Sequence, residues 1–239
     1  MSFDKLPSKA TLDIEAFTIH FSDEKLDFMK KLIELSPIAD KTYESNLPDR
    51  SLGLSHEWFV NAVEVWKNDF DWYVLPPQRQ RLPNKFRRKH EAHMNTFNHF
   101  KATVKDEKGD LTIHFVGLFS NKPDAVPIVL LHGWPGSFIE FLPMLDLFRK
   151  QFTPNTLAHH FIVPSLPGYT FSDPPPMDTD FRIEDVARVL NSLAIGVGFG
   201  DGYVVQGGDI GSKVGRIMAA VHDECKAAHR KSFSNSIYP

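Results

Sequence analysis

Cysteine is almost absent from this sequence, since Cys225 is the single thiol among 239 residues. One thiol cannot form a disulfide within the chain, and it cannot by itself build a cysteine-ligated metal site. A strong charge imbalance is absent too, because the formal net charge is only −3 at pH 7. Such a small charge gives no bulk electrostatic attraction to nucleic acid or to a membrane surface, so we expect no nucleic-acid partner.

The sequence also lacks a long apolar run. A helix needs about 20 mostly apolar residues to span a bilayer, and no stretch reaches that length. Residues 1–11 do not show the basic-then-apolar pattern of a secretory signal. From these absences we expect a cytoplasmic protein without a membrane anchor.

Histidine is plentiful by comparison, with 11 residues, but its spacing does not suit a metal site. His159 and His160 are adjacent, so on a strand their side chains would point to opposite faces. We therefore predict no metal site. The segment Gly196-Val-Gly-Phe-Gly200 resembles a dinucleotide-binding loop only faintly, because it follows a predicted helix rather than a strand. We interpret it as a helix C-cap and loop.

Helical patterns dominate the first 70 residues. Ser22 is a predicted N-cap for a helix that runs to Leu35, with acidic residues in its first turn and Pro37 beyond its end. A second helix is predicted from Ser55. The apolar residues of both helices recur on one side, and we interpret these stripes as core-packing faces: Leu26, Met29 and Ile33 in the first, and Phe59, Ala62, Val63 and Trp66 in the second.

A basic run follows between residues 79 and 89. Such a run is compatible with a nuclear-import or nucleic-acid patch, but it is more often a solvated loop, and we favour the loop. Its basic residues are Arg79, Arg81, Lys85, Arg87, Arg88 and Lys89.

Strands and helices alternate from residue 111 onward. Strands are predicted at 111–119, 128–131, 161–163 and 203–206, and helices at 138–148, around 183–194, and after residue 211. This alternation indicates an α/β fold: a doubly wound, mostly parallel sheet with helices on both faces.

The strongest chemical signal is Gly207-Gly-Asp209-Ile-Gly211, which lies between a predicted strand and a predicted helix. A tight strand-turn-helix pushes its central side chain out above the sheet, and Gly207 and Gly211 let the backbone pass closely. Serine hydrolases place serine at this centre, whereas this chain has Asp209. A carboxylate is already ionised at neutral pH, so Asp209 is a candidate nucleophile toward an sp³ carbon. The alternative is a glycine-rich turn in which Asp209 is a helix N-cap.

A second motif, His132-Gly-Trp-Pro-Gly-Ser137, follows the predicted strand at 128–131. In a fold of this kind the loop after that strand supplies one oxyanion-hole amide, and the residue after the nucleophile supplies the other. We assign these amides to Trp134 and Ile210. Gly133 allows the sharp turn and Pro135 makes it rigid. We interpret His132 as a structural residue rather than a catalytic base, because it precedes the turn.

With these motifs the sequence resembles the epoxide hydrolases of the microsomal type, particularly their soluble fungal members. The resemblance covers most of residues 15–229, and it implies an α/β-hydrolase fold, a small-molecule epoxide as substrate, no cofactor, and Asp209 as nucleophile. A full-length member is expected to form a homodimer. Further matching segments are Phe17-Thr-Ile19, Trp58, Trp66, Asp71-Trp72, Met94-Asn-Thr-Phe97, Ile113-His-Phe115 and Pro164-Ser-Leu-Pro-Gly-Tyr169.

A haloalkane dehalogenase would share the aspartate elbow. Those enzymes are similar in placing tryptophan directly after the nucleophile, where its indole N–H binds the departing halide. This chain has Ile210 there, which has no side-chain donor. The dehalogenase-like alternative is therefore less favoured.

The pattern departs from the family near the end. Only 30 residues follow Asp209, and the family's acid, its histidine and the tyrosines of its cap come later. We expect residues 1–110 to form an N-terminal extension, with 73–87 as an insertion. Residues 111–229 would form the first half of a hydrolase core that stops after the nucleophile helix, and residues 230–239 an atypical tail. The chain as written is then expected to be catalytically incomplete, or a non-enzymatic relic or partner of a full-length paralogue.

Overall fold

The computed structural model describes residues 2–68 and 89–231, which form two compact units. The larger unit combines residues 1–18 with residues 94–239, and the smaller one spans Ile19–His93. This grouping differs from the expected boundary at residue 110, because strands before that residue pair with strands after it. The expected insertion at 73–87 and residues 232–239 of the expected tail lie outside the described residues.

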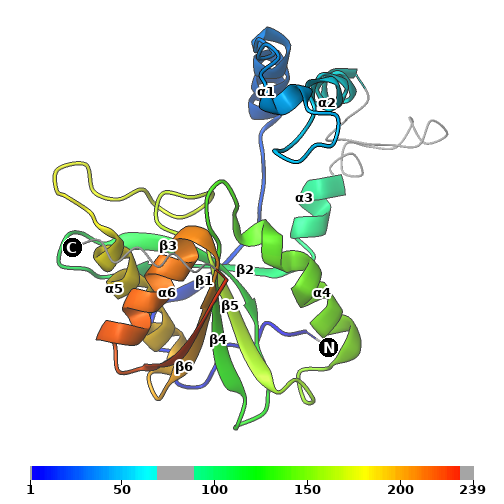
Figure 1. Cartoon of the computed structure of the whole chain (residues 1–239). Helices are drawn as coiled ribbons and strands as arrows, with labels where there is room; N and C mark the ends of the chain where they lie inside the picture. The colour runs from blue at the N-terminus through cyan, green and yellow to red at the C-terminus, as the bar shows by residue number, and fades with distance from the viewer. Residues whose placement is uncertain (1, 69–88, 232–239) are drawn as a thin grey trace. The chain divides into compact units, whose positions relative to one another are not determined.

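The larger unit is built on a seven-stranded sheet with the order β1-β2-β3-β5-β4-β6-β7 (Figure 1). The neighbours β1, β2, β3 and β5 pair antiparallel in that order, whereas the neighbours β5, β4, β6 and β7 pair parallel. The α/β fold class is thus confirmed, and the parallel part holds the strand that leads to Asp209. The strands are β1 (Ile14–Phe17), β2 (Asn98–Val104), β3 (Leu111–Leu118), β4 (Val126–Leu131), β5 (His159–Pro164), β6 (Tyr203–Gly207) and β7 (Cys225–Arg230).

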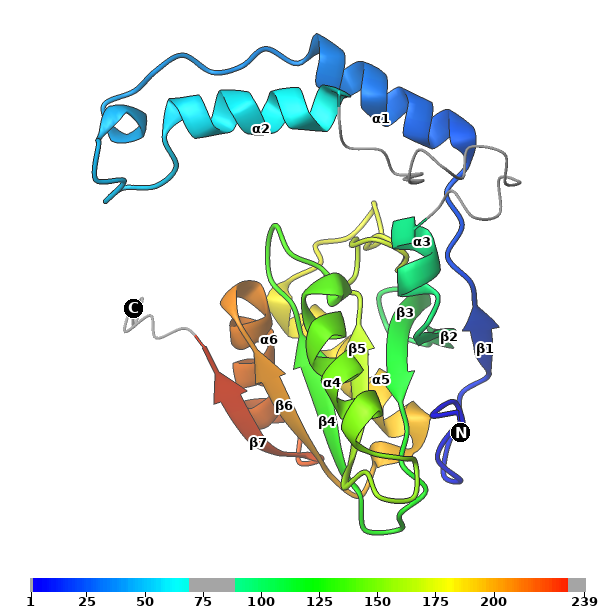
Figure 2. The ribbon, with the colours of Figure 1, turned by 90° about the vertical axis from the view of Figure 1, so that its right-hand side faces the viewer.

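Helices cover both faces of this sheet. Figures 1 and 2 show α4 on one face and α5 with α6 on the other. The core between the sheet and α5 and α6 is apolar and fully buried, as at Phe115, Leu193 and Val205. The helical elements are the 3₁₀ helix η4 (Phe138–Phe141), α4 (Leu142–Gln151), α5 (Ile183–Ala194), the π turn η5 (Ile195–Phe199) and α6 (Asp209–Val221).

The segment from Gly196 to Gly200 forms the predicted helix end and loop. Gly198 lies inside the π turn with φ 112°, a left-handed conformation that favours glycine. The carbonyl of Gly196 accepts hydrogen bonds from the amides of Thr11 (2.8 Å) and Leu12 (3.2 Å). The π turn therefore holds the N-terminal arm of the chain in place.

The smaller unit holds α1 (Asp23–Leu35), the 3₁₀ helix η1 (Glu44–Asn46), α2 (His56–Asn68) and most of α3 (Lys89–Met94). The predicted cap is present, since Ser22 Oγ accepts a hydrogen bond from the Lys25 amide at 3.3 Å. The core-packing prediction for α2 is wrong, because α2 has no buried residue and both Phe59 and Trp66 are exposed. In α1 only Leu26 is buried.

Candidate active site

The turn after β6 positions Asp209. β6 ends at Gly207, Gly208 caps α6, and Asp209 is the first residue of that helix. Asp209 has φ 49°, a left-handed conformation that a non-glycine residue adopts only at a cost of about 1–3 kcal/mol. The N-cap alternative for Asp209 is wrong, because Gly208 occupies the cap position.

Glycines at both ends of the turn permit its tight packing. A Cβ on Gly207 would lie 2.4 Å from the carbonyl oxygen of Gly211, and a Cβ on Gly211 would lie 2.4 Å from the carbonyl oxygen of Leu131. Real Cβ atoms do not approach a backbone oxygen so closely, so any other residue would push α6 away from β4. The two glycines thus fix where the side chain of Asp209 emerges.

The loop after β4 meets the Asp209 side chain directly. The amide of Trp134 donates a hydrogen bond of 2.8 Å to Oδ1 of Asp209, although 75 residues separate the two. Gly133 is necessary for this approach, because a Cβ there would lie 2.6 Å from Cβ of Asp209. The peptide bond between Trp134 and Pro135 is cis. The structure thus brings together Asp209 and both residues expected to supply the oxyanion hole.

The electrostatics of this contact favour the ionised form of Asp209. Hydrogen bonds from the backbone of Trp134 and of Ile210 hold the pKa of Asp209 below its ordinary value, and the Lys213 ammonium acts in the same direction. Partial desolvation opposes them but does not prevail. Asp209 is therefore a carboxylate at neutral pH.

His132 uses both of its ring nitrogens within the fold. Its Nε2 lies 3.1 Å from the amide of Leu166 and accepts that hydrogen bond, so Nδ1 carries the proton and donates to the carbonyl of Gly133 at 3.1 Å. Burial also lowers the pKa of His132. These bonds favour a neutral ring that shapes the loop, in agreement with the structural interpretation.

Two other histidines follow Asp209 in the chain. His222 is the C-cap of α6 and lies ~18 Å along the helix axis from its first turn, at about 1.5 Å per residue. His229 lies near the end of β7, in register with Gln206. No hydrogen bond or ion pair joins either histidine to Asp209 in the part of the chain that the structure describes.

The sequence did not point to Glu140, which lies in η4 at the same edge of the sheet. Desolvation raises the pKa of Glu140, the nearby Asp209 charge adds to the increase, and Lys231 opposes both. A Cβ on Gly136 would lie 2.9 Å from Oε2 of Glu140, so this carboxyl group packs against the loop that follows β4. The only available signal was its position three residues after Ser137, the N-cap of η4.

The described residues contain neither a metal-binding cluster nor a membrane-spanning helix. No group of three histidine, cysteine or acidic side chains is arranged to hold a metal ion within residues 2–68 and 89–231. In the same ranges no helix has both the length and the hydrophobicity to cross a bilayer.

Comparison with known proteins adds the family to this geometry. Residues 14–141 match the family model described as epoxide hydrolase N terminus, and residues 126–229 match the α/β hydrolase fold. A curated relative from Dothistroma septosporum shares 40% identity over 95% of this chain and 51% of its own length, so the chain spans about half the length of that relative.

Solved structures agree with this assignment. An epoxide hydrolase from Aspergillus niger shares 47% identity with a TM-score of 0.84, over 100% of this chain and 57% of that one. The juvenile hormone epoxide hydrolase of the silkworm Bombyx mori shares 27% identity with a TM-score of 0.69, over 93% of this chain and 53% of that one. The matched family model covers more than half of the sequence, and the chain belongs to the epoxide hydrolases of the α/β-hydrolase superfamily.

Proposed function

We propose that this chain carries the nucleophilic half of an epoxide hydrolase reaction, with Asp209 as the attacking group. The observation that carries the proposal is the contact between Oδ1 of Asp209 and the amide of Trp134 at 2.8 Å. It orients the carboxylate so that one oxygen is held by the loop while the other is left for attack.

The first step is ring opening. The second carboxylate oxygen attacks one epoxide carbon, the bond from that carbon to the ring oxygen breaks, and an ester links Asp209 to the substrate. The released alkoxide takes a proton from solvent. This step needs no base, because Asp209 is ionised beforehand.

The second step is hydrolysis of that ester. Water adds to the carbonyl carbon of Asp209, and the negative charge develops on Oδ1, where the amides of Trp134 and Ile210 would stabilise it. The intermediate then collapses: the bond from the carbonyl carbon to the ester oxygen breaks, that oxygen takes up a proton, and the diol leaves while the Asp209 carboxylate is restored. The attacking water must also lose a proton, so an efficient reaction requires a base. His132 is a poor base, since both of its nitrogens are engaged. We therefore propose that the chain alone reaches the ester and hydrolyses it slowly.

Mass spectrometry of the intact protein tests both steps. Incubation with styrene oxide should add one substrate mass per chain, and peptide mapping should place it on Asp209. Asp209→Asn should abolish the adduct, whereas Glu140→Gln, which removes the neighbouring carboxyl group, should keep it. Equal labelling of both variants would indicate unselective alkylation and would overturn the assignment.

Turnover separates the two halves of the proposal. Diol formed in many equivalents per chain would contradict slow ester hydrolysis but would leave Asp209 as nucleophile. In H₂¹⁸O, hydrolysis through the ester carbonyl should place ¹⁸O in the Asp209 carboxylate. Neither adduct nor diol would sink the enzymatic proposal and favour a non-enzymatic partner of a longer hydrolase.

Two finer expectations also remain proposals. A cytoplasmic location is supported by the single free thiol of Cys225, which suits a reducing compartment, and subcellular fractionation would test it. A homodimer is expected of a full-length member, and light scattering of such a protein at several concentrations would test it.

A further inference from the structure

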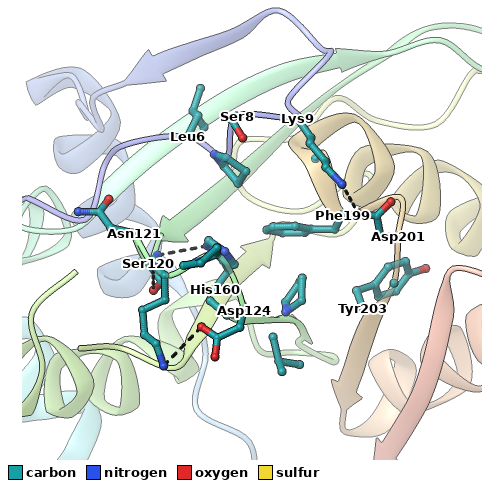
Figure 3. Close-up of a pocket in the computed structure, with 18 of the residues that line it drawn as sticks. Leu6, Ser8, Lys9, Ser120, Asn121, Asp124, His160, Phe199, Asp201 and Tyr203 are labelled. Atoms are coloured by element: carbon teal, nitrogen blue, oxygen red, sulfur yellow. Dashed lines mark hydrogen bonds and ion pairs between the residues drawn. The ribbon is translucent and has the colours of Figure 1, made fainter. Parts of the chain in front are cut away.

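Figure 3 shows residues that line a cavity, whose volume is about 660 Å³. Its walls are the arm Lys5–Lys9, residues 120–127, and residues 198–204. The last two segments enter β4 and β6 at their amino ends, whereas Asp209 follows the carboxyl end of β6. Because these strands are parallel, the cavity and the candidate active site lie at opposite edges of the sheet.

The wall formed by the N-terminal arm is held in place at both ends. The carbonyl of Phe3 accepts a hydrogen bond of 2.9 Å from the amide of Phe119, and the amide of Thr11 donates one of 2.8 Å to Gly196. A Cβ on Gly198 would lie 3.0 Å from the amide nitrogen of Ala10, so glycine there lets the arm pack closely. The cavity is thus pre-formed, and its volume suits a small organic ligand.

His160 contributes one hydrogen-bond donor to this cavity. Its Nδ1 accepts a hydrogen bond of 3.2 Å from the amide of Ser120, and burial lowers the pKa of the ring, which is therefore neutral. A neutral imidazole that accepts at Nδ1 carries its proton on Nε2. The side chain is only 9% exposed, and no described residue accepts a hydrogen bond from Nε2.

The surrounding charges identify what could accept that hydrogen bond. Four lysines and two aspartates line the cavity, which gives a formal charge of +2 on a chain whose net charge is −3. Lys9 pairs with Asp201, and Lys122 pairs with Asp124 at 3.5 Å. Neither Lys5 nor Lys226 has a carboxylate partner among the described residues, although the Lys226 ammonium donates a hydrogen bond of 2.7 Å to the carbonyl of Asp223. The excess positive charge favours an anion.

Part of the lining is apolar. The Phe199 ring is buried and lies 5.4 Å from the His160 ring, between centroids, and Leu6 lines the arm side. We propose that this cavity binds a small organic anion, a carboxylate or a phosphate monoester. Its head group would accept from His160 Nε2 and the lysines, and its aromatic or aliphatic body would pack on Leu6 and Phe199.

Ligand-observed NMR titrations of the intact chain test this proposal. Benzoate and phenyl phosphate represent the two head groups, benzamide is the neutral counterpart of benzoate, and inorganic phosphate lacks the apolar body. At least one aromatic anion should bind saturably, and more tightly than benzamide or inorganic phosphate. The proposal is wrong if neither does so below about 10 mM, the weak end of specific binding, or if benzamide or inorganic phosphate binds equally well.

Three variants locate the binding. Lys226→Gln should weaken affinity about tenfold, which corresponds to one charge-assisted hydrogen bond. Lys105→Gln, at an exposed lysine outside the cavity, should leave it unchanged. His160→Gln should retain most of the binding, because its amide can both accept from Ser120 and donate into the cavity. Equal affinity for Lys226→Gln and wild type would overturn the proposal.

One measurement on the wild-type chain and one variant at the other edge of the sheet complete the test. In the wild-type chain, the ¹⁵N shift of His160 Nε2 should move in parallel with saturation, and an unmoved shift would overturn the site. Asp209→Asn should bind the same anions with unchanged affinity, since the two sites are at opposite edges of the sheet. Loss of binding in that variant would place the anion at Asp209 and contradict the proposal.

Discussion

The two units of this chain differ in what their apolar side chains contact. In the larger unit, which contains the sheet, Phe115 is 0% exposed and stacks on Phe100 with ring centroids 5.4 Å apart. In the unit Ile19–His93, Phe28 is 61% exposed although it lies on a regular, capped helix. Phe28 lies outside the predicted stripe of α1, but Phe59 and Trp66 are exposed on the predicted stripe of α2. Helical periodicity therefore predicts that an apolar face exists, but it does not predict which surface covers that face.

The largest effect expected from this difference is on stability. Phe115→Ala should lower the free energy of unfolding by about 3–5 kcal/mol, through lost burial and the cavity left behind. The matched change Phe28→Ala should cost under about 1 kcal/mol, as for other exposed positions. Urea denaturation followed by circular dichroism measures both. A similar cost at the two positions would show that α1 is covered in solution.

The sequence was a good guide where local signals and strand order agreed. Ser22 and the acidic residues after it placed the start of α1 correctly. The glycine pattern around Asp209 and the strand before Trp134 were sufficient to expect that these two residues meet, because parallel neighbouring strands end at the same edge.

The sequence failed where structure depends on distant segments without a repeating pattern. The exposure of Phe59 and Trp66 on α2 could not be predicted from periodicity. Glu140 carries no motif, and its proximity to the nucleophile arises from the η4 turn. The cavity around His160 is lined by residues 5–9, 120–127 and 198–204, which lie far apart in the sequence, so no local motif predicts it.

The Arg188 ion pairs of the larger unit are more buried than the Lys67 ion pair of the smaller unit. Arg188 forms two hydrogen bonds with Asp106, of 2.8 and 2.9 Å, and one of 2.7 Å with Asp185, and both carboxylates are nearly buried. Arg188→Gln should cost about 2–3 kcal/mol, because it removes the cation paired with the desolvated Asp106 carboxylate, whereas Asp185 keeps its ion pair with Lys108 at 2.8 Å. Lys67→Gln, which removes an exposed pair with Glu64, should cost under about 0.5 kcal/mol.

Urea denaturation at pH 7 compares the two variants, and the pH dependence adds a check. Arg188 holds the pKa of Asp106 below its ordinary value in the folded state. The stabilisation from this pair is thus present above the unfolded pKa and is lost as pH falls through the folded one. A wild-type acid slope in Arg188→Gln would contradict this role.

Buried histidines should make the larger unit sensitive to milder acid. His114 Nε2 lies 3.0 Å from His99 Nδ1, and His114 Nδ1 lies 2.8 Å from Ser165 Oγ. Burial, with the charges of His99 and Lys101, lowers the pKa of His114 to about 3. Between the unfolded pKa of about 6.5 and this value only the unfolded chain binds the proton, so stability falls with pH.

The loss from His114 should amount to about 2 kcal/mol between pH 7 and pH 5. His114→Gln removes the titration and should flatten the stability profile in that window, whatever its cost at pH 7. An unaltered slope in His114→Gln would show that other groups cause the acid sensitivity.

The smallest expected effect concerns the smaller unit alone. Ser22→Ala removes the side-chain acceptor for the Lys25 amide and should destabilise the first turn of α1 by about 0.5–1 kcal/mol. Ser36→Ala, at the other end of the helix, is the matched control, because it affects the last turn. Hydrogen exchange should become several-fold faster at the first-turn amides only in Ser22→Ala. Because few side chains of α1 and α2 are buried, this local loss should not reach the sheet, whose slowest amides report global unfolding. If those amides accelerate equally, the two units unfold as one, and the contrast between Phe28 and Phe115 reflects position within a single cooperative structure rather than independent units.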